Sequence, residues 1–299
     1  PALLENLVKA GLQLSRLSLL PHDSGLRIKL GLLEQGSSSN TAREKATRQA
    51  EEPNQDGLKY FSGCMARYLQ PSIAEATTCV AEELTDLPVH EPDQQVCCGL
   101  AAWSAGKLEE AKRLAKKNIE AFDGTGDILT SCASCSAHLT KYPSLFADDP
   151  EWALKAEQFS ERVREFTFFI EENIGGRELK GQAGQRVYYH EPYHLRFASN
   201  RNDAAGNLLA KAECTEQIKA EPGSQCCGQG GLFHLGYPEL SENIFSQAHA
   251  HAESNDAEVV ITTCSGCLMQ WQAGLAKYQS QIKALHFVFW LKKHLPINS

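Results

Sequence analysis

The chain has 299 residues, of which 42 % are hydrophobic and 22 % charged, and its formal net charge at pH 7 is −8. This length and apolar content suffice for one large domain or two modest ones. The acidic balance disfavours nucleic-acid binding, which requires a basic surface. No apolar run approaches the roughly 18 residues of a transmembrane helix, so we expect no transmembrane segment.

Residues 1–57 are predicted to form a helical segment followed by a flexible linker. Leucines recur at helical spacing between Leu4 and Leu20, which indicates an amphipathic helix that packs on a neighbouring domain. Residues 34–57 are polar and contain no aromatic side chain, as is typical of a surface linker. The chain begins at Pro1 and shows no signal-peptide pattern, so we expect a piece of a longer protein.

Residues 58–150 are predicted to alternate short strands with helices. The patterns favour strands at 58–61, 89–96 and 127–130 and helices at 71–84 and 106–122. Cysteines follow each predicted strand: Cys64, then Cys97 with Cys98, then Cys132 with Cys135.

Residues 151–185 are predicted to be a helical connector, and residues 186–299 repeat the plan of the first half. Strands are expected at 186–190 and 259–262, and helices at 207–212, at 238–253 and from 268 onward. The matching cysteines are Cys226 with Cys227 and Cys264 with Cys267. Cys226 stands 129 positions after Cys97, and Tyr193 stands 129 positions after Cys64. This repetition predicts an internal duplication.

The alternation of strands and helices predicts an α/β protein with two tandem, pseudo-symmetric domains and a parallel sheet in each. Functional loops of such sheets lie at the carboxyl ends of the strands, which is where the paired cysteines fall. Cys79 and Cys214 lie outside the repeated pattern, so we interpret them as structural.

The cysteine pattern favours bound metal over disulfides. Adjacent cysteines make awkward disulfide partners, and the chain is neither small nor visibly exported. Five first-half thiols exceed the four of a structural zinc site, and sulfur-only ligation also fits iron–sulfur chemistry. Iron–sulfur and zinc therefore both remain open. The second half has Tyr193, a poor ligand with a pKa near 10, so the two sites are expected to differ.

Three other patterns indicate less. The glycines Gly228, Gly230 and Gly231 lack the spacing and acidic partner of a dinucleotide loop. His190 and His194 either hydrogen-bond to the sulfur atoms of a cluster or cap the turn around Tyr193. A cysteine–histidine nucleophilic pair would not need paired motifs, so no catalytic residue is assigned.

These motifs resemble those of the cysteine-rich CCG-domain family, which includes the B-type subunit of heterodisulfide reductase and the iron–sulfur subunits of glycolate, lactate and glycerol-3-phosphate dehydrogenases. The family pattern is a cysteine, Cys-Cys-Gly and C-x-x-C at spacings of some 35 residues. The first half matches in full, whereas His190-Glu191-Pro192-Tyr193-His194-Leu195 carries Tyr193 where the family commonly has cysteine. The stretch Gly266-Cys267-Leu268-Met269-Gln270 is most similar to the glycolate oxidase iron–sulfur subunit.

The resemblance implies Rossmann-like CCG domains and a 4Fe–4S cluster in the first half, of the noncubane form in the heterodisulfide reductase branch. The metal ligands would be Cys64, Cys97, Cys98, Cys132 and Cys135 in the first half and Cys226, Cys227, Cys264 and Cys267 in the second, with His190, Tyr193 and His194 next to the cofactor. Tyr193 leaves a second cluster in question. A ferredoxin-like domain, which precedes such domains in the glycolate oxidase subunit, has no motif here, so it would be another domain or subunit.

The resemblance further implies an electron-transfer subunit of a flavin-dependent 2-hydroxy-acid dehydrogenase of the glycolate or D-lactate type. FAD would lie on a partner subunit, and a quinone or another carrier would accept the electrons. The expected location is the cytoplasm or the inner face of the membrane, as a peripheral protein. Two alternatives stay open: a heterodisulfide reductase-like subunit that reduces a disulfide at its own cluster, and a zinc-stabilised interaction module.

Overall fold

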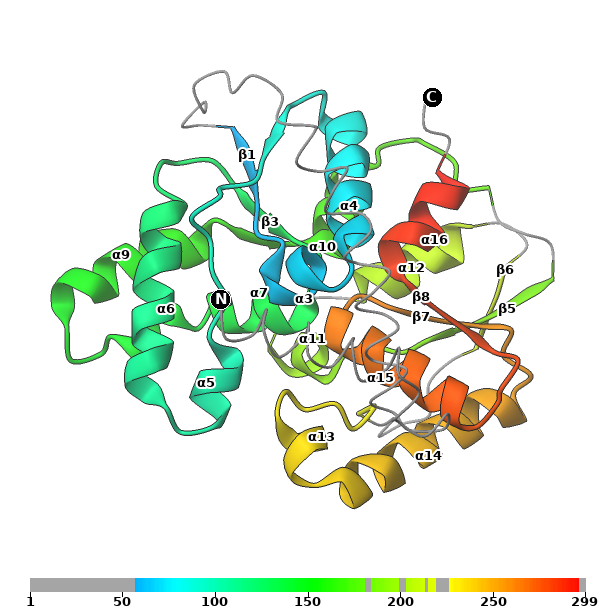
Figure 1. Ribbon diagram of the computed structural model, residues 1–299. Helices are drawn as coiled ribbons and strands as arrows, with labels where there is room; N and C mark the ends of the chain where they lie inside the picture. The colour runs from blue at the N-terminus through cyan, green and yellow to red at the C-terminus, as the bar shows by residue number, and fades with distance from the viewer. Residues whose placement is uncertain (1–56, 181–183, 199–202, 213–214, 219–225, 296–299) are drawn as a thin grey trace, which may run out of the picture.

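A computed structural model describes residues 57–180, 184–198, 203–212, 215–218 and 226–295 (Figure 1). The amphipathic helix and linker expected over residues 1–57 lie outside this part of the chain except for Gly57, and Cys214 also lies outside it. The described residues form two α/β halves that follow each other along the chain and pack side by side.

The first half contains a four-stranded parallel sheet. Its strands are β1 (Leu58–Tyr60), β2 (Val89–His90), β3 (Ile128–Thr130) and β4 (Val163–Glu165), in the order β2-β1-β3-β4. The helices are α3 (Gly63–Tyr68), α4 (Pro71–Thr85), α5 (Leu100–Ser104), α6 (Leu108–Ala121), α7 (Ala133–Leu139), α8 (Tyr142–Leu145), α9 (Pro150–Glu161) and α10 (Phe166–Asn173). β1 and β3 are buried along their whole length, as parallel strands covered by helices on both faces should be.

The second half repeats this topology. Its strands are β5 (Gln185–Tyr189), β6 (Thr215–Ile218), β7 (Val259–Thr262) and β8 (Lys283–His286), in the order β6-β5-β7-β8, and all pairs are parallel. The helices are α11 (Tyr193–Ala198), α12 (Ala204–Lys211), α13 (Phe233–Gly236), α14 (Pro238–Ser254), α15 (Ser265–Lys277) and α16 (Phe287–His294). The predicted fold class, two tandem Rossmann-like units with parallel sheets, is confirmed.

Four strands and the C-terminal helical region differ most from the sequence-based expectation. β4 lies within the segment predicted as a helical connector, and β6 was not predicted. The helix predicted from residue 268 onward ends at Lys277, and β8 and α16 follow it. The strand expected over 89–96 is only β2, Val89–His90. These strands have two to four residues each, too few for an alternating pattern to stand out. The domain boundaries at 150 and 185 stay a prediction.

The two halves share their hydrophobic cores. One apolar cluster joins Phe122 and Phe159 of the first half to Phe245 and Trp271 of the second, and another joins residues of both sheets on their other side. Each fully buried aromatic side chain stabilises the fold by roughly 1.5–3 kcal/mol relative to an exposed one. The halves are therefore held together by a continuous apolar interior.

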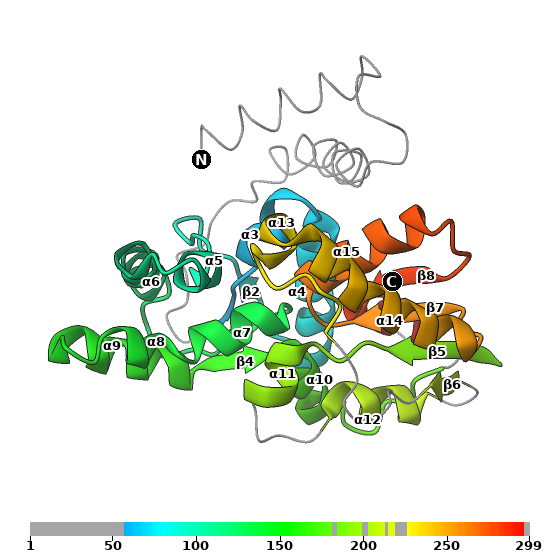
Figure 2. The same ribbon diagram turned by 90° about the horizontal axis from the view of Figure 1, so that it is seen from below.

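Polar contacts also join the halves where β3 and β7 end. The backbone N–H of Ala133 donates to the carbonyl oxygen of Thr263 at 3.0 Å, and His286 Nε2 lies 2.9 Å from the carbonyl oxygen of Ser131. Burial lowers the pKa of His286 to about 4, so its ring is neutral and Nε2 can donate this bond. Figure 2 shows α7 and α11 next to each other at this junction.

Candidate metal centre

The strand ends place the cysteines of each half at one edge of its sheet. Cys64 lies in α3, directly after β1, and Cys132 precedes α7, directly after β3. Cys264 takes the same position between β7 and α15 in the second half. Because the strands of each sheet are parallel, their carboxyl ends meet at one edge, and the cysteines converge there.

The glycine of each Cys-Cys-Gly motif has a left-handed backbone conformation, with φ of 94° at Gly99 and 82° at Gly228. A Cβ at residue 228 would lie 3.1 Å from the carbonyl carbon of Ser241 and overlap its carbonyl oxygen. Only glycine combines this φ with so close an approach. The turn thus lies directly against α14, and Ser241 Oγ donates to the carbonyl oxygen of Gly228 at 2.8 Å.

The five first-half thiols form a continuous series of contacts. Cys64 hydrogen-bonds to Cys97, Cys97 to Cys98, Cys98 to Cys135 and Cys135 to Cys132. The pKa of Cys97 is lowered because its sulfur accepts hydrogen bonds from Cys64 and Cys98. The pKa of Cys64 is raised, chiefly by the hydrogen bond that it donates to Cys97 and secondly by burial. Hydrogen bonds therefore connect the sulfur atoms of this series. A bound metal would take the place of the protons in these bonds, because thiols lose their protons when they bind metal.

Two buried polar side chains support the backbone of the first cysteine pair. Asn118 Nδ2 donates to the carbonyl oxygen of Cys97 at 3.1 Å, and Tyr142 Oη donates to that of Cys98 at 2.8 Å. Asn118 also contacts Tyr142 Oη at 3.0 Å. Sequence reasoning missed both residues. The signal for Asn118 was a polar residue within the apolar stripe of α6, where it is fully buried.

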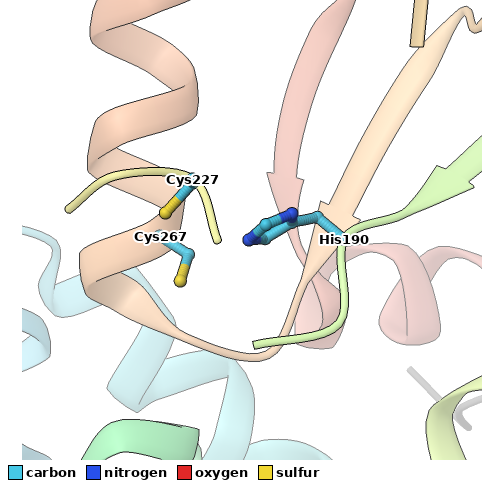
Figure 3. Close-up of side chains that lie close together, drawn as sticks. All are labelled: His190, Cys227 and Cys267. Atoms are coloured by element: carbon cyan, nitrogen blue, oxygen red, sulfur yellow. The ribbon is translucent and has the colours of Figure 1, made fainter. Parts of the chain in front are cut away.

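The second-half thiols form a similar series. Cys226 hydrogen-bonds to Cys227, Cys227 to Cys267 and Cys267 to Cys264. The ligand atoms of Cys227, Cys267 and His190 all lie within 4.8 Å of one another, and all three residues are buried. Figure 3 shows the ring of His190 directed from the end of β5 toward the two cysteines.

The two series of thiols meet between the halves. Cys132 hydrogen-bonds to Cys264. Ser134, in the C-x-x-C motif of the first half at the start of α7, has its Oγ 3.1 Å from Cys264 Sγ and 3.1 Å from His194 Nδ1. Every cysteine of the two motifs thus belongs to one connected group of sulfur atoms.

The family model described as "CCG: Cysteine-rich domain" matches this chain twice, over residues 58–140 and 187–272. Together the two matches cover more than half of the chain's 299 residues. The chain belongs to the cysteine-rich CCG-domain family.

Curated relatives align with most of this CCG protein. It is 31 % identical over 230 residues to "Lactate utilization protein A" of Bacillus velezensis, which covers 77 % of this chain and 96 % of that protein. The protein of the same name from Shouchella clausii is 29 % identical over 229 residues, covering 77 % and 95 %. The "Probable glycolate oxidase iron-sulfur subunit" of Bacillus subtilis is 28 % identical over 239 residues, covering 78 % of this chain and 54 % of that protein.

The donor atoms of this CCG protein fit a metal–sulfur group. Thiolates from several loops suit zinc or iron–sulfur clusters. Polar atoms beside the thiols are also buried without a hydrogen-bond partner among the described residues, and they include two possible donors, His138 Nε2 and Ser265 Oγ. Burial lowers the pKa of His138 to about 4, so its neutral ring can donate one hydrogen bond. A buried polar atom without a partner destabilises the fold. A hydrogen-bond donor next to thiolates could donate to the inorganic sulfide of a cluster.

The remaining predicted residues lie at different distances from the thiols. Tyr193 begins α11, its side chain is 54 % exposed, and its ring packs edge-on against His194. His194 contacts the site through Ser134, as described above. Cys79 is half-buried on α4, and within the described part of the chain no contact joins it to another thiol. Among the same residues, no helix is long and apolar enough to span a bilayer.

Proposed function

We propose that this chain is the iron–sulfur electron-transfer subunit of a flavin-dependent 2-hydroxy-acid dehydrogenase of the glycolate or D-lactate type. The single observation that carries the proposal is the connected group of thiols described above, most of them buried, to which both halves contribute. The relatives add the substrate class, because their names refer to lactate utilisation and to glycolate oxidase. The reduced thiols favour a cytoplasmic location.

In this proposal the thiols of Cys64, Cys97, Cys98, Cys132 and Cys135 hold a 4Fe–4S cluster, and those of Cys226, Cys227, Cys264 and Cys267 hold the metal of the second half. A bound iron–sulfur cluster accepts and releases one electron at a time, over a wide range of potentials. The protein would set the potential by burial and by hydrogen bonds to sulfur. His138 is placed for the second role, because its unpaired Nε2 lies near Gly99, the residue that follows the first cysteine pair.

The contact between Cys132 and Cys264 would connect the two sites. Oxidation of a 2-hydroxy acid to a 2-oxo acid releases two electrons, which FAD on a partner subunit would accept as a hydride. This chain would then carry the electrons singly to a ferredoxin-like domain or subunit, a quinone or another acceptor. Each half needs only to alternate between two oxidation states.

Metal analysis tests the first part of the proposal. Anaerobically purified protein should contain about four iron and four sulfide per occupied half, and little zinc. Cys64→Ser should remove the iron of the first half. Cys79→Ser is the matched control, since Cys79 is also partly buried but lies outside the connected thiols, and it should leave the iron content unchanged. Stoichiometric zinc with almost no iron, even after anaerobic reconstitution, would leave a zinc-stabilised module instead.

Reduction experiments test the second part. A dithionite-reduced sample should lose visible absorbance, and an FAD-containing glycolate or D-lactate dehydrogenase subunit should produce the same change when its substrate is added. If the isolated chain reduces a disulfide catalytically without any flavoprotein, the heterodisulfide reductase-like alternative is correct.

A further inference from the structure

The second half has one cysteine fewer than the first, and a different side chain lies next to its thiols. Tyr193 stands where the repeat would have cysteine, but 54 % of its side chain is exposed. His190, three residues earlier at the end of β5, is only 2 % exposed. The side chain that could serve as a fifth ligand in this half is therefore the imidazole of His190.

The ring of His190 is held in a fixed position. Its backbone N–H donates to the carbonyl oxygen of Ile261 in β7 at 2.9 Å. The ring packs edge-on against Trp271 of α15, with the ring centroids 5.6 Å apart. These contacts come from the two elements that flank Cys264, so the ring and the thiols of Cys264 and Cys267 are positioned by the same strand–helix unit.

The polar neighbours of the His190 ring are sulfur atoms. Its Nε2 atom is buried, and no oxygen or nitrogen atom among the described residues hydrogen-bonds to it. The ring does contact the thiol of Cys227, whose pKa is lowered by hydrogen bonds with Cys226, Cys267 and His190. A thiol is a weak hydrogen-bond partner, and an under-satisfied buried nitrogen destabilises the fold. A metal bound to the nitrogen would remove this cost.

The three donor atoms also have the spacing of metal ligands. A ligand nitrogen of His190 and the sulfur atoms of Cys227 and Cys267 already lie within 4.8 Å of one another (Figure 3). Zn–S and Zn–N bonds of about 2.3 and 2.0 Å separate tetrahedral ligands by roughly 3.5–3.8 Å, about 1 Å less than this limit. Only small side-chain movements would therefore bring all three atoms onto one metal.

We propose that His190 is a metal ligand in the second half, where its imidazole nitrogen joins the thiolates of Cys227 and Cys267. The inference refines the proposed function, because it makes the first site sulfur-only and the second site mixed. A neutral imidazole carries one negative charge fewer than a thiolate. Histidine ligation raises the potential of iron–sulfur centres, so electrons that enter the first half would move toward the second.

The test uses Co²⁺ as a probe on the full chain, prepared anaerobically without metal. Cys97→Ser and Cys135→Ser together interrupt the first-half thiols, so that cobalt reports on the second half. In this background, His190→Ala should weaken Co²⁺ binding more than 100-fold, beyond the roughly 10–100-fold loss typical of a residue that only supports a ligand. His194→Ala, the matched control, should weaken it by less than about tenfold.

His190→Cys keeps the test informative if His190→Ala does not fold. This variant should bind Co²⁺ as the background protein does, but with its ligand-field bands at lower energy, because a thiolate is a weaker-field ligand than imidazole. A loss smaller than 100-fold in His190→Ala, or unchanged bands in His190→Cys, would overturn the inference. Because Co²⁺ binding does not require iron, either result is independent of the iron content that tests the proposed function.

Discussion

The turn at Gly228 gives a quantitative test of how the fold supports the site. Gly228→Ala places a methyl group at a residue with φ of 82° and against the backbone of Ser241. The left-handed conformation costs an alanine about 1–2 kcal/mol. The overlap forces the turn or α14 to move, which adds about 1–3 kcal/mol. The unfolding free energy should therefore fall by about 2–5 kcal/mol.

Gly106→Ala separates the two contributions. Gly106 has a similar φ of 72°, is exposed, and a Cβ there would contact nothing within 4 Å. Its substitution should cost only the conformational part, reduced by about 0.4–1 kcal/mol because alanine is less flexible in the unfolded chain. The measurement is urea unfolding of both variants at one pH, together with their iron content. Equal losses of stability in the two variants would refute the steric argument, and Gly228→Ala should also retain less iron.

Three further predictions concern single side chains. Burial raises the pKa of Glu165 to about 7 from 4.5. Its contribution to stability is therefore fully present below about pH 4.5 and is lost as the pH rises through 7. Urea unfolding across this range should show about 3 kcal/mol of pH dependence in the unfolding free energy, and Glu165→Gln should remove it. Tyr142→Phe should cost about 1–3 kcal/mol in thermal unfolding by leaving the carbonyl oxygen of Cys98 unpaired, and unchanged stability would contradict that role. Tyr193→Phe should leave the iron content unchanged, whereas a loss would make the phenol a ligand.

The pseudo-symmetry of the halves extends to the last strand of each sheet but with different chemistry. Glu165 ends β4 and its carboxylate accepts hydrogen bonds at the start of α10, while His286 ends β8 and its ring accepts one at the start of α16. Of the two, His286 also has a described hydrogen bond to the other half, through Ser131. The duplicated fold thus retains the positions of its capping residues but not their charge.

Local periodicity and repeated spacing were enough to predict the fold class and the grouping of the cysteines. β1, β3, β5 and β7 are the central strands, and their apolar and aromatic residues made them predictable. The sequence placed the first-half cysteines and the second C-x-x-C motif after predicted strands, and parallel strands bring such positions together at one sheet edge. These inferences succeeded because they depend on chain-local pattern and on topology. The assignment of individual ligands stays a prediction.

The way in which the two halves meet became visible only in three dimensions. The contact between Cys132 and Cys264 and the hydrogen bonds of Ser134 depend on the packing of one half against the other, which no sequence period encodes. The same holds for the support of the cysteine backbone by buried side chains of α6 and α8. The structure likewise separated Tyr193 from His190. Both flank the same turn in sequence, but the direction of β5 buries the histidine beside the thiols and leaves the tyrosine largely exposed.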